Sequence, residues 1–338
     1  MTRTTPQRPV DIVSLFPELA PMARTAVRLH PRPGTPTVSD SSVGGPLLWP
    51  ANEPWPMCTQ DRIRYWGHAA ALDDIRLLRA TLATAWSRPQ LPGVNQLTAQ
   101  EQAIVRRVRA GHPWSAGPNA LLPVAQLYLR DIPGLRAPRG ADLLQVLWCP
   151  IAHSDSLPAA RLVWRSSASV GALLTDPPRP GDVDDGGHHV PEACVVYPEQ
   201  VTEYPSPDSL STELCERIWE WGEREADPEV GGSYYGAELS SAPGWKIGGW
   251  ERWTFCDPSP TLCGECGTQM YPLLTVDSKE WAVNGLSWMP FEDRSEHANP
   301  RADLRFARPV GVQIGRSYNM QIYSCPASFD HPHLQYMQ

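Results

Sequence analysis

"VGGPLLW" at residues 43–49 and "IGGWERW" at residues 247–253 share one pattern, and this match decides the predicted fold. Each stretch has a β-branched residue, two adjacent glycines and a tryptophan that follows the glycines. A second matching pair, "LQVLWCP" at 144–150 and "MQIYSCP" at 320–326, occurs in the same order along the chain. Self-similar segments of this kind are typical of duplicated structural units. The sequence therefore predicts two copies of one supersecondary structure.

The first copy has more residues between its Gly-Gly segment and its Cys-Pro segment than the second copy has, so we expect an insertion there. The inserted stretch reads "LDDIRLLRATLATAW" at 72–86 and "LTAQEQAIVRRVRAG" at 97–111. Thr98 and Glu101 form a capping box at the start of the second segment, and Gly111 provides a stop signal. These features predict a helical insertion.

Most other segments are short, rich in β-branched residues and bounded by turns, as in antiparallel strands. Such strands are predicted at 123–129, 142–148, 160–166, 193–198, 271–276, 311–315 and 318–324. Apolar residues at helical spacing predict another helix at 212–226, and residues 11–30 can form a helix that Pro17 starts or interrupts. The predicted fold class is α+β: two similar antiparallel sheets from an internal duplication, with a few peripheral helices and long Pro-rich loops.

The repeat pattern divides the chain into four parts. Residues 1–42 are expected to be an N-terminal helical segment, and residues 43–155 the first repeat with its helical insertion. Residues 156–246 supply connecting strands and a helix. Residues 247–338 form the second repeat, which carries a Cys-x-x-Cys motif.

The composition narrows the choice of partners and compartment. A formal net charge of −8 over 338 residues argues against nucleic acid and anionic membranes, and fits a protein partner with a basic surface. No apolar run approaches the ~20 residues of a membrane helix, and the first residues lack a signal-peptide core. We therefore expect a cytoplasmic protein whose eight cysteines are thiols or metal ligands.

The segment "CGECG" at 263–267 predicts a zinc site. Its turn directs the sulfurs of Cys263 and Cys266 at one ion, and Gly267 can take the positive φ that follows. A redox dithiol is an alternative, but that motif normally starts a helix, whereas here a predicted strand follows. Two incidental thiols are the remaining alternative.

Cys325 is the predicted third ligand, because in a true repeat it ends the sheet that Cys263 begins. We favour His331 as the fourth ligand, with Cys256 and His333 as alternatives. Four protein ligands would make the zinc structural, since a catalytic zinc keeps a position open.

The first copy has only Cys58 and Cys149 at the corresponding places, so these thiols are expected to be a vestigial site buried as small hydrophobes. The run Asp184, Asp185, His188 and His189 offers further donors, but its glycine-rich and proline-rich surroundings favour a solvated loop. His153 and Asp155 are not expected to form an acid-base pair, because near neighbours on irregular chain rarely share a cleft.

Several motifs resemble the YwqG-like family of uncharacterised bacterial proteins. They are "RLHPRPGTP" (28–36), "SSVGGPLLWPANEPWPMC" (41–58), "KIGGW" (246–250) and "CGECGTQMYPLLTVDSKEW" (263–281). The resemblance implies an α+β body with two similar antiparallel sheets and no established activity. Association of such proteins with toxin and immunity loci implies an immunity-like role. The chain departs from the expected pattern at Ser328, where a second cysteine could stand after Cys325.

The sequence contains no Gly-x-Ser-x-Gly elbow and no phosphate-binding Gly-Lys loop. We therefore predict a non-catalytic, zinc-stabilised bacterial binding or protein-interaction module without catalytic residues. The alternative is a metal-dependent enzyme, or a small-molecule-binding protein with an aromatic cleft between the two sheets. The abundance of tryptophan, 14 residues, suits either a core between sheets or such a cleft.

Overall fold

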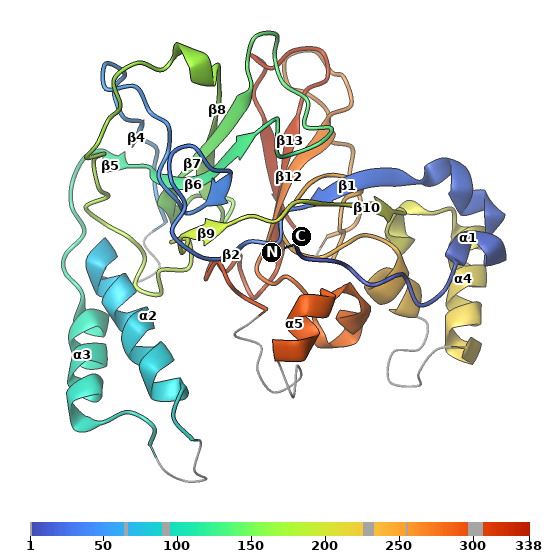
Figure 1. Cartoon of the computed structure of the whole chain (residues 1–338), viewed down its shortest axis with the longest axis horizontal. Coiled ribbons are helices and arrows are strands. Elements are labelled where there is room, and N and C mark those ends of the chain that lie inside the picture. Colours follow the sequence, from blue (N-terminus) through green and yellow to red (C-terminus); the bar gives the residue numbers. More distant parts are fainter. Residues whose placement is uncertain (1, 64–66, 90–94, 226–232, 255, 297–306) are drawn as a thin grey trace.

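The computed structural model describes residues 2–63, 67–89, 95–225, 233–254, 256–296 and 307–338 (Figure 1). It is an α+β structure with two six-stranded antiparallel sheets, one two-stranded ribbon and a few helices. This architecture confirms the predicted α+β class with two antiparallel sheets and a few helices. None of the helices within these ranges is both long and apolar enough to cross a membrane.

The first sheet has the strand order β2-β9-β3-β6-β7-β8. Its strands are β2 (Arg32–Pro33), β9 (Cys194–Val195), β3 (Ser42–Val43), β6 (Leu122–Tyr128), β7 (Leu143–Ala152) and β8 (Pro158–Arg165). The predicted strands at 123–129, 142–148 and 160–166 are β6, β7 and β8. Beside this sheet, β4 (Met57–Cys58) pairs with β5 (Asn119–Ala120) in the small ribbon.

The second sheet has the strand order β10-β1-β11-β12-β13-β14. Its strands are β10 (Glu199–Glu203), β1 (Arg24–Arg28), β11 (Lys246–Gly248), β12 (Tyr271–Asp277), β13 (Asn319–Ser324) and β14 (Leu334–Met337). The strand predicted at 311–315 is wrong. Gly311 and Gly315 have φ values of 68° and 50°, which turn the backbone, and Ile314 makes only an isolated bridge to Tyr318.

The strands that carry the two predicted repeats have the same order, β3-β6-β7-β8 and β11-β12-β13-β14. Their registers also correspond, since Val43 pairs with Ala125 while Ile247 pairs with Leu274. Both β6 and β12 have an irregular register near their start. A duplication would explain these parallels, and it stays a prediction.

Each sheet contains one inner strand from the other half of the chain. β1 comes from the N-terminal region but lies between β10 and β11. β9 comes from the middle of the chain but lies between β2 and β3. The connections β1 to β2 and β9 to β10 therefore run from one sheet to the other.

One large hydrophobic core joins the two sheets. It includes Val146 and Trp148 of β7 as well as Ile322 of β13, and none of these side chains is exposed. The rings of Trp148 and Trp245 lie 6.4 Å apart, so large aromatic side chains fill the space between the sheets.

The predicted insertion in the first repeat is a pair of helices, α2 (Leu72–Trp86) and α3 (Ala99–Ala110), which pack on each other at one end of the molecule (Figure 1). The capping box of Thr98 and Glu101 is present, and Gly111 ends α3 with a φ of 58°. The predicted helix at 212–226 is α4 (Thr212–Glu225) as far as the described residues extend.

The N-terminal segment is less helical than predicted. α1 (Ile12–Leu15) and η1 (Pro17–Met22) are short and pack against α4 and the π-helical turn η5 (Tyr235–Leu239). The helical expectation for 1–42 is wrong beyond Met22, where β1 begins after Ala23. Two prolines inside η1 remove backbone donors, and the following "RTAVR" suits a strand. The remaining helical elements are η2 (Ser167–Ser169), η3 (Pro207–Ser209), η6 (Val283–Trp288) and α5 (Phe291–Glu296).

Candidate metal centre

The Cys-x-x-Cys motif lies in a tight turn that leads into β12. A bridge between Leu262 and Gln269 closes the base of this turn. Inside it, the Cys263 amide donates to Thr268 at 2.9 Å, and the Gly267 amide donates to the Cys263 carbonyl at 2.8 Å. Gly267 has the predicted positive φ, 69°. These backbone bonds hold the motif as a turn and not as the start of a helix.

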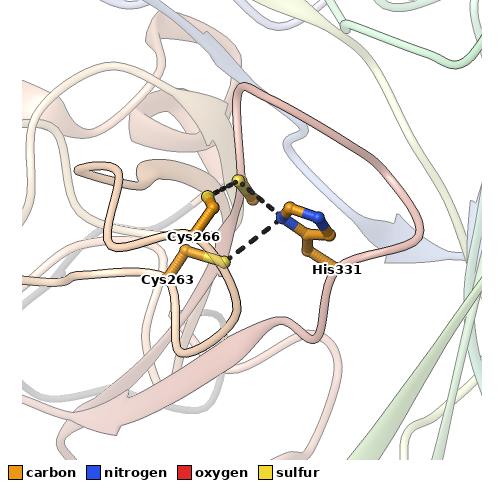
Figure 2. Close-up of side chains that lie close together, drawn as sticks. Cys263, Cys266 and His331 are labelled. Carbon is orange, nitrogen blue, oxygen red and sulfur yellow. Dashed lines mark hydrogen bonds between the residues drawn. The ribbon is translucent and has the colours of Figure 1, made fainter.

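The other two candidate ligands lie in the connection between β13 and β14. Cys325 directly follows β13, and His331 precedes β14. Nδ1 of His331 lies 3.4 Å from the sulfurs of both Cys263 and Cys325, and the sulfurs of Cys266 and Cys325 lie 3.5 Å apart (Figure 2). All four ligand atoms lie within 4.8 Å of one another.

These separations suit a tetrahedral metal ion. With zinc about 2.3 Å from sulfur and about 2.0–2.1 Å from nitrogen, neighbouring ligand atoms lie roughly 3.5–3.8 Å apart. The 3.4 Å and 3.5 Å separations are close to this range. The group of Cys263, Cys266, Cys325 and His331 can therefore hold a metal such as zinc.

The sulfurs of Cys266 and Cys325 differ in exposure and in the pKa of their thiols. Cys266 is exposed, and the hydroxyl of Thr268, 3.3 Å from its sulfur, is the main cause that lowers the pKa of this thiol to about 6. Cys325 is buried beside Tyr323, and desolvation raises the pKa of its thiol. The cluster thus combines one thiol that ionises easily, Cys266, with one that needs a nearby cation to ionise, Cys325.

The two alternative fourth ligands lie outside this group. Cys256 is exposed, and its backbone amide donates to the Gln338 side chain at 3.2 Å. His333 has a ring nitrogen 3.4 Å from the Gln335 side-chain oxygen, and burial lowers the pKa of this histidine. The geometry places His331, and neither alternative, with the three cysteines.

The first half contains a smaller cluster. Cys58 and Cys149 are buried as expected, and burial raises the pKa of the Cys149 thiol to about 12. His153, which the sequence analysis did not connect with them, lies with its Nε2 3.6 Å from the Cys58 sulfur. Its position a few residues after a Cys-Pro pair, like that of His331, was the available signal.

A separate cavity of about 600 Å³ lies between the halves, lined by residues that include Trp114, Asp184, His189 and Tyr318. The expectation of a solvated loop holds for the exposed His188 but is wrong for His189, which is only 5% exposed and whose backbone carbonyl accepts a hydrogen bond from the buried Trp148 ring. Burial opposes ionisation of Asp184, but the neighbouring His189 outweighs it and lowers the pKa of this carboxyl.

Most tryptophans of the repeat elements are part of the core. The fully buried ones are Trp49, Trp148, Trp245, Trp281 and Trp288. Trp114 is the partly buried tryptophan at the 600 Å³ cavity. The tryptophans therefore pack in several hydrophobic clusters, of which the one between the sheets contains Trp148 and Trp245.

Neither a protein-family model nor a curated protein matches this chain. The resemblance to the YwqG-like proteins thus rests on the sequence motifs alone.

Proposed function

We propose that the chain is a non-catalytic, zinc-stabilised binding or protein-interaction module. One observation carries the proposal: three cysteines and one histidine place their ligand atoms within 4.8 Å of one another. Four protein ligands fill the tetrahedron of a zinc ion and leave no position for a substrate. A zinc ion held in this way has a structural role.

The zinc would connect parts of the second sheet that are distant in the chain. Cys263 and Cys266 lie before β12, while Cys325 and His331 lie at the two ends of the β13–β14 turn. Metal binding in such a site contributes directly to the free energy of folding. The eight cysteines are free thiols in the structure, which fits the reducing cytoplasm that the sequence predicts.

The proposed partner is a protein with a basic surface. A net charge of −8 favours association with a cationic surface, mainly through the association rate. The resemblance to YwqG-like proteins adds an immunity-like role, in which the partner would be the product of a neighbouring toxin gene. The resemblance supports this role by association only.

Two measurements test the proposal. Elemental analysis and X-ray absorption of the purified protein should give a zinc with three sulfur ligands and one nitrogen ligand for this site. Purified products of the neighbouring genes should then include a basic protein that binds the chain, with an affinity that falls as salt rises. An open, water-ligated zinc at Cys263, Cys266 and Cys325 would contradict the structural role, and binding only to acidic or unrelated proteins would contradict the partner.

A second candidate function is small-molecule binding or metal-dependent catalysis in the 600 Å³ cavity. It is favoured by Asp184 Oδ2 and His189 Nδ1, which are buried, lie 3.5 Å apart and have no well-formed hydrogen bond with any described residue. Buried polar atoms without such bonds suit a site that a ligand completes. A metabolite that co-purifies with the wild type but not with Asp184→Asn would move the assignment to this function.

A further inference from the structure

Three metal-binding side chains also converge in the first half of the molecule. Cys58 lies on β4, Cys149 lies on β7, and His153 directly follows β7. Their ligand atoms lie within 4.8 Å of one another, and Nε2 of His153 is 3.6 Å from the Cys58 sulfur. The three side chains are 6%, 0% and 6% exposed, respectively, so the cluster is inside the protein.

We propose that Cys58, Cys149 and His153 form a second zinc site. Two thiolates and one imidazole bind zinc in preference to hard cations such as Mg²⁺ or Ca²⁺, which take oxygen ligands. The proposal does not depend on the function of the Cys263 cluster, because no residue is shared between the two groups.

The histidine is held as a metal ligand should be. Its Nε2 faces the Cys58 sulfur at 3.6 Å, so the ring already points a ligand nitrogen toward one of the two thiols. The backbone amide of His153 donates to Leu157 at 2.8 Å, so the turn after β7 holds the residue in place as well.

The place of the cluster in the fold matches that of the first. Cys149 in β7 and Cys325 after β13 each precede a proline, and each is followed by the histidine of its cluster. β7 and β13 occupy the same position in the two sheets. Cys58 lies in the chain before β6, as Cys263 lies before β12.

The two clusters differ in the number of protein ligands. Among the described residues, the cluster in the first half has three ligand atoms where the other has four. The fourth position of its zinc would thus be taken by a water molecule or another exchangeable group. Cys58 also lines a cavity of about 400 Å³ that reaches His331, so solvent can approach this part of the cluster.

The test is the zinc content of the folded full-length chain after equilibration with Zn²⁺ and removal of excess metal. Wild type should contain two zinc ions per chain. Cys149→Ala and His153→Gln should each contain one, and Cys194→Ala should retain two. Cys194 is a matched control, because it is equally buried and belongs to neither group.

A chelator adds a second readout. Zinc release from wild type should have a fast and a slow phase, since the ion with three protein ligands exchanges more easily. The fast phase should disappear in His153→Gln and remain in Cys266→Ser. Co²⁺ substitution should give sulfur-to-cobalt charge-transfer absorption in Cys266→Ser, and Cys149→Ala in that background should abolish it.

Two results would overturn the second site. In the first, wild type takes up only one zinc ion and Cys266→Ser takes up none. In the second, His153→Gln still takes up two zinc ions. If Cys266→Ser left the zinc content unchanged while Cys149→Ala lowered it, the first cluster would be wrong and the second supported. Circular dichroism checks folding, and His153→Gln decides the question if Cys149→Ala does not fold.

Discussion

The sulfur of Cys266 lies 3.5 Å from the sulfur of Cys325, although the two residues are 59 positions apart in the chain. β12 and β13 are antiparallel neighbours, so the turn before β12 and the residue after β13 meet at one end of the sheet. A metal ion at this point would link three consecutive strands of the second sheet. Its removal should therefore affect more than the local turn.

Cys266→Ser should abolish zinc binding at the Cys3His cluster and lower the free energy of unfolding by several kcal/mol, as is typical when a structural metal is lost. The reason is that three ligands with one neutral hydroxyl hold zinc much less tightly than four. Zinc analysis together with urea denaturation measures both effects. Cys256→Ser is the matched control, because Cys256 is an exposed thiol outside the cluster. Equal zinc content and stability in the two variants would contradict the assignment.

His331→Ala should weaken zinc binding strongly, whereas His333→Ala should leave it unchanged. Nδ1 of His331 contacts the sulfurs of Cys263 and Cys325, while the nearest partner of the His333 ring is Gln335. Competition with a chelator of known affinity measures the difference. A loss of affinity confined to His333→Ala would mean that the β13–β14 turn adopts another conformation in the metal-bound protein.

Gly249→Ala should destabilise the fold, because Gly249 has a φ of 76° and a Cβ there would lie 2.3 Å from Glu203 Oε2. The left-handed backbone alone costs about 1–2 kcal/mol for a residue with a Cβ, and the close contact adds to this. Thermal unfolding measures the effect. Gly171→Ala should be almost neutral, since no atom lies within 4 Å of its added Cβ. If Gly249→Ala were as stable as Gly171→Ala, the glycine pair would not be needed for the strand connection.

Glu203→Gln should lower the free energy of unfolding by about 3–5 kcal/mol, the usual cost of breaking a buried ion pair. Lys246 and Glu203 are both fully buried, and the lysine nitrogen lies 2.7 Å from each carboxylate oxygen. The amide would leave the ammonium group without its countercharge. Combining Glu203→Gln with Lys246→Met should recover much of the loss, as chemical denaturation can show. Glu18→Gln, in the exposed pair with Arg217, should have no measurable effect.

Stability should fall in acid, in part because of Glu280. Burial opposes ionisation of this carboxyl, but His30 and Arg32 outweigh it and lower its pKa in the folded protein. A lowered folded pKa stabilises the protein above the unfolded value of about 4.3, and this contribution is lost as the pH falls through the folded pKa. Glu280→Gln should show a smaller loss of stability than wild type between neutral pH and pH 3. Parallel pH profiles of the two proteins would contradict this role.

The sequence predicted the regular parts of the fold well. Thr98, Glu101 and Gly111 define α3 because capping acts within a few residues. The apolar β-branched runs of β6, β7 and β13 are also local signals. The strand at Arg24–Arg28 was missed, since its pairing with residues near positions 200 and 247 depends on contacts between distant parts of the chain.

The sequence predicted only those parts of the candidate metal centre that depend on residues close together in the chain. Cys263 and Cys266 are close in sequence, so their spacing alone indicates a common ion. The choice of His331 over His333 depends on the exact turn between β13 and β14, which the spacing leaves open. His153 follows a Cys-Pro pair as His331 does, but its contact with Cys58 joins distant parts of the chain through the β4–β5 ribbon, so the local pattern alone did not connect them.

The placement of β1 and β9 has a consequence for any attempt to divide this protein. A cut between β8 and β9 would leave the first fragment without the strand that separates β2 from β3, and the second without the strand between β10 and β11. Neither fragment could complete its own sheet, because each contains the inner strand that the other lacks. The whole chain should thus unfold cooperatively, and the two fragments should recover a native structure only when they are mixed.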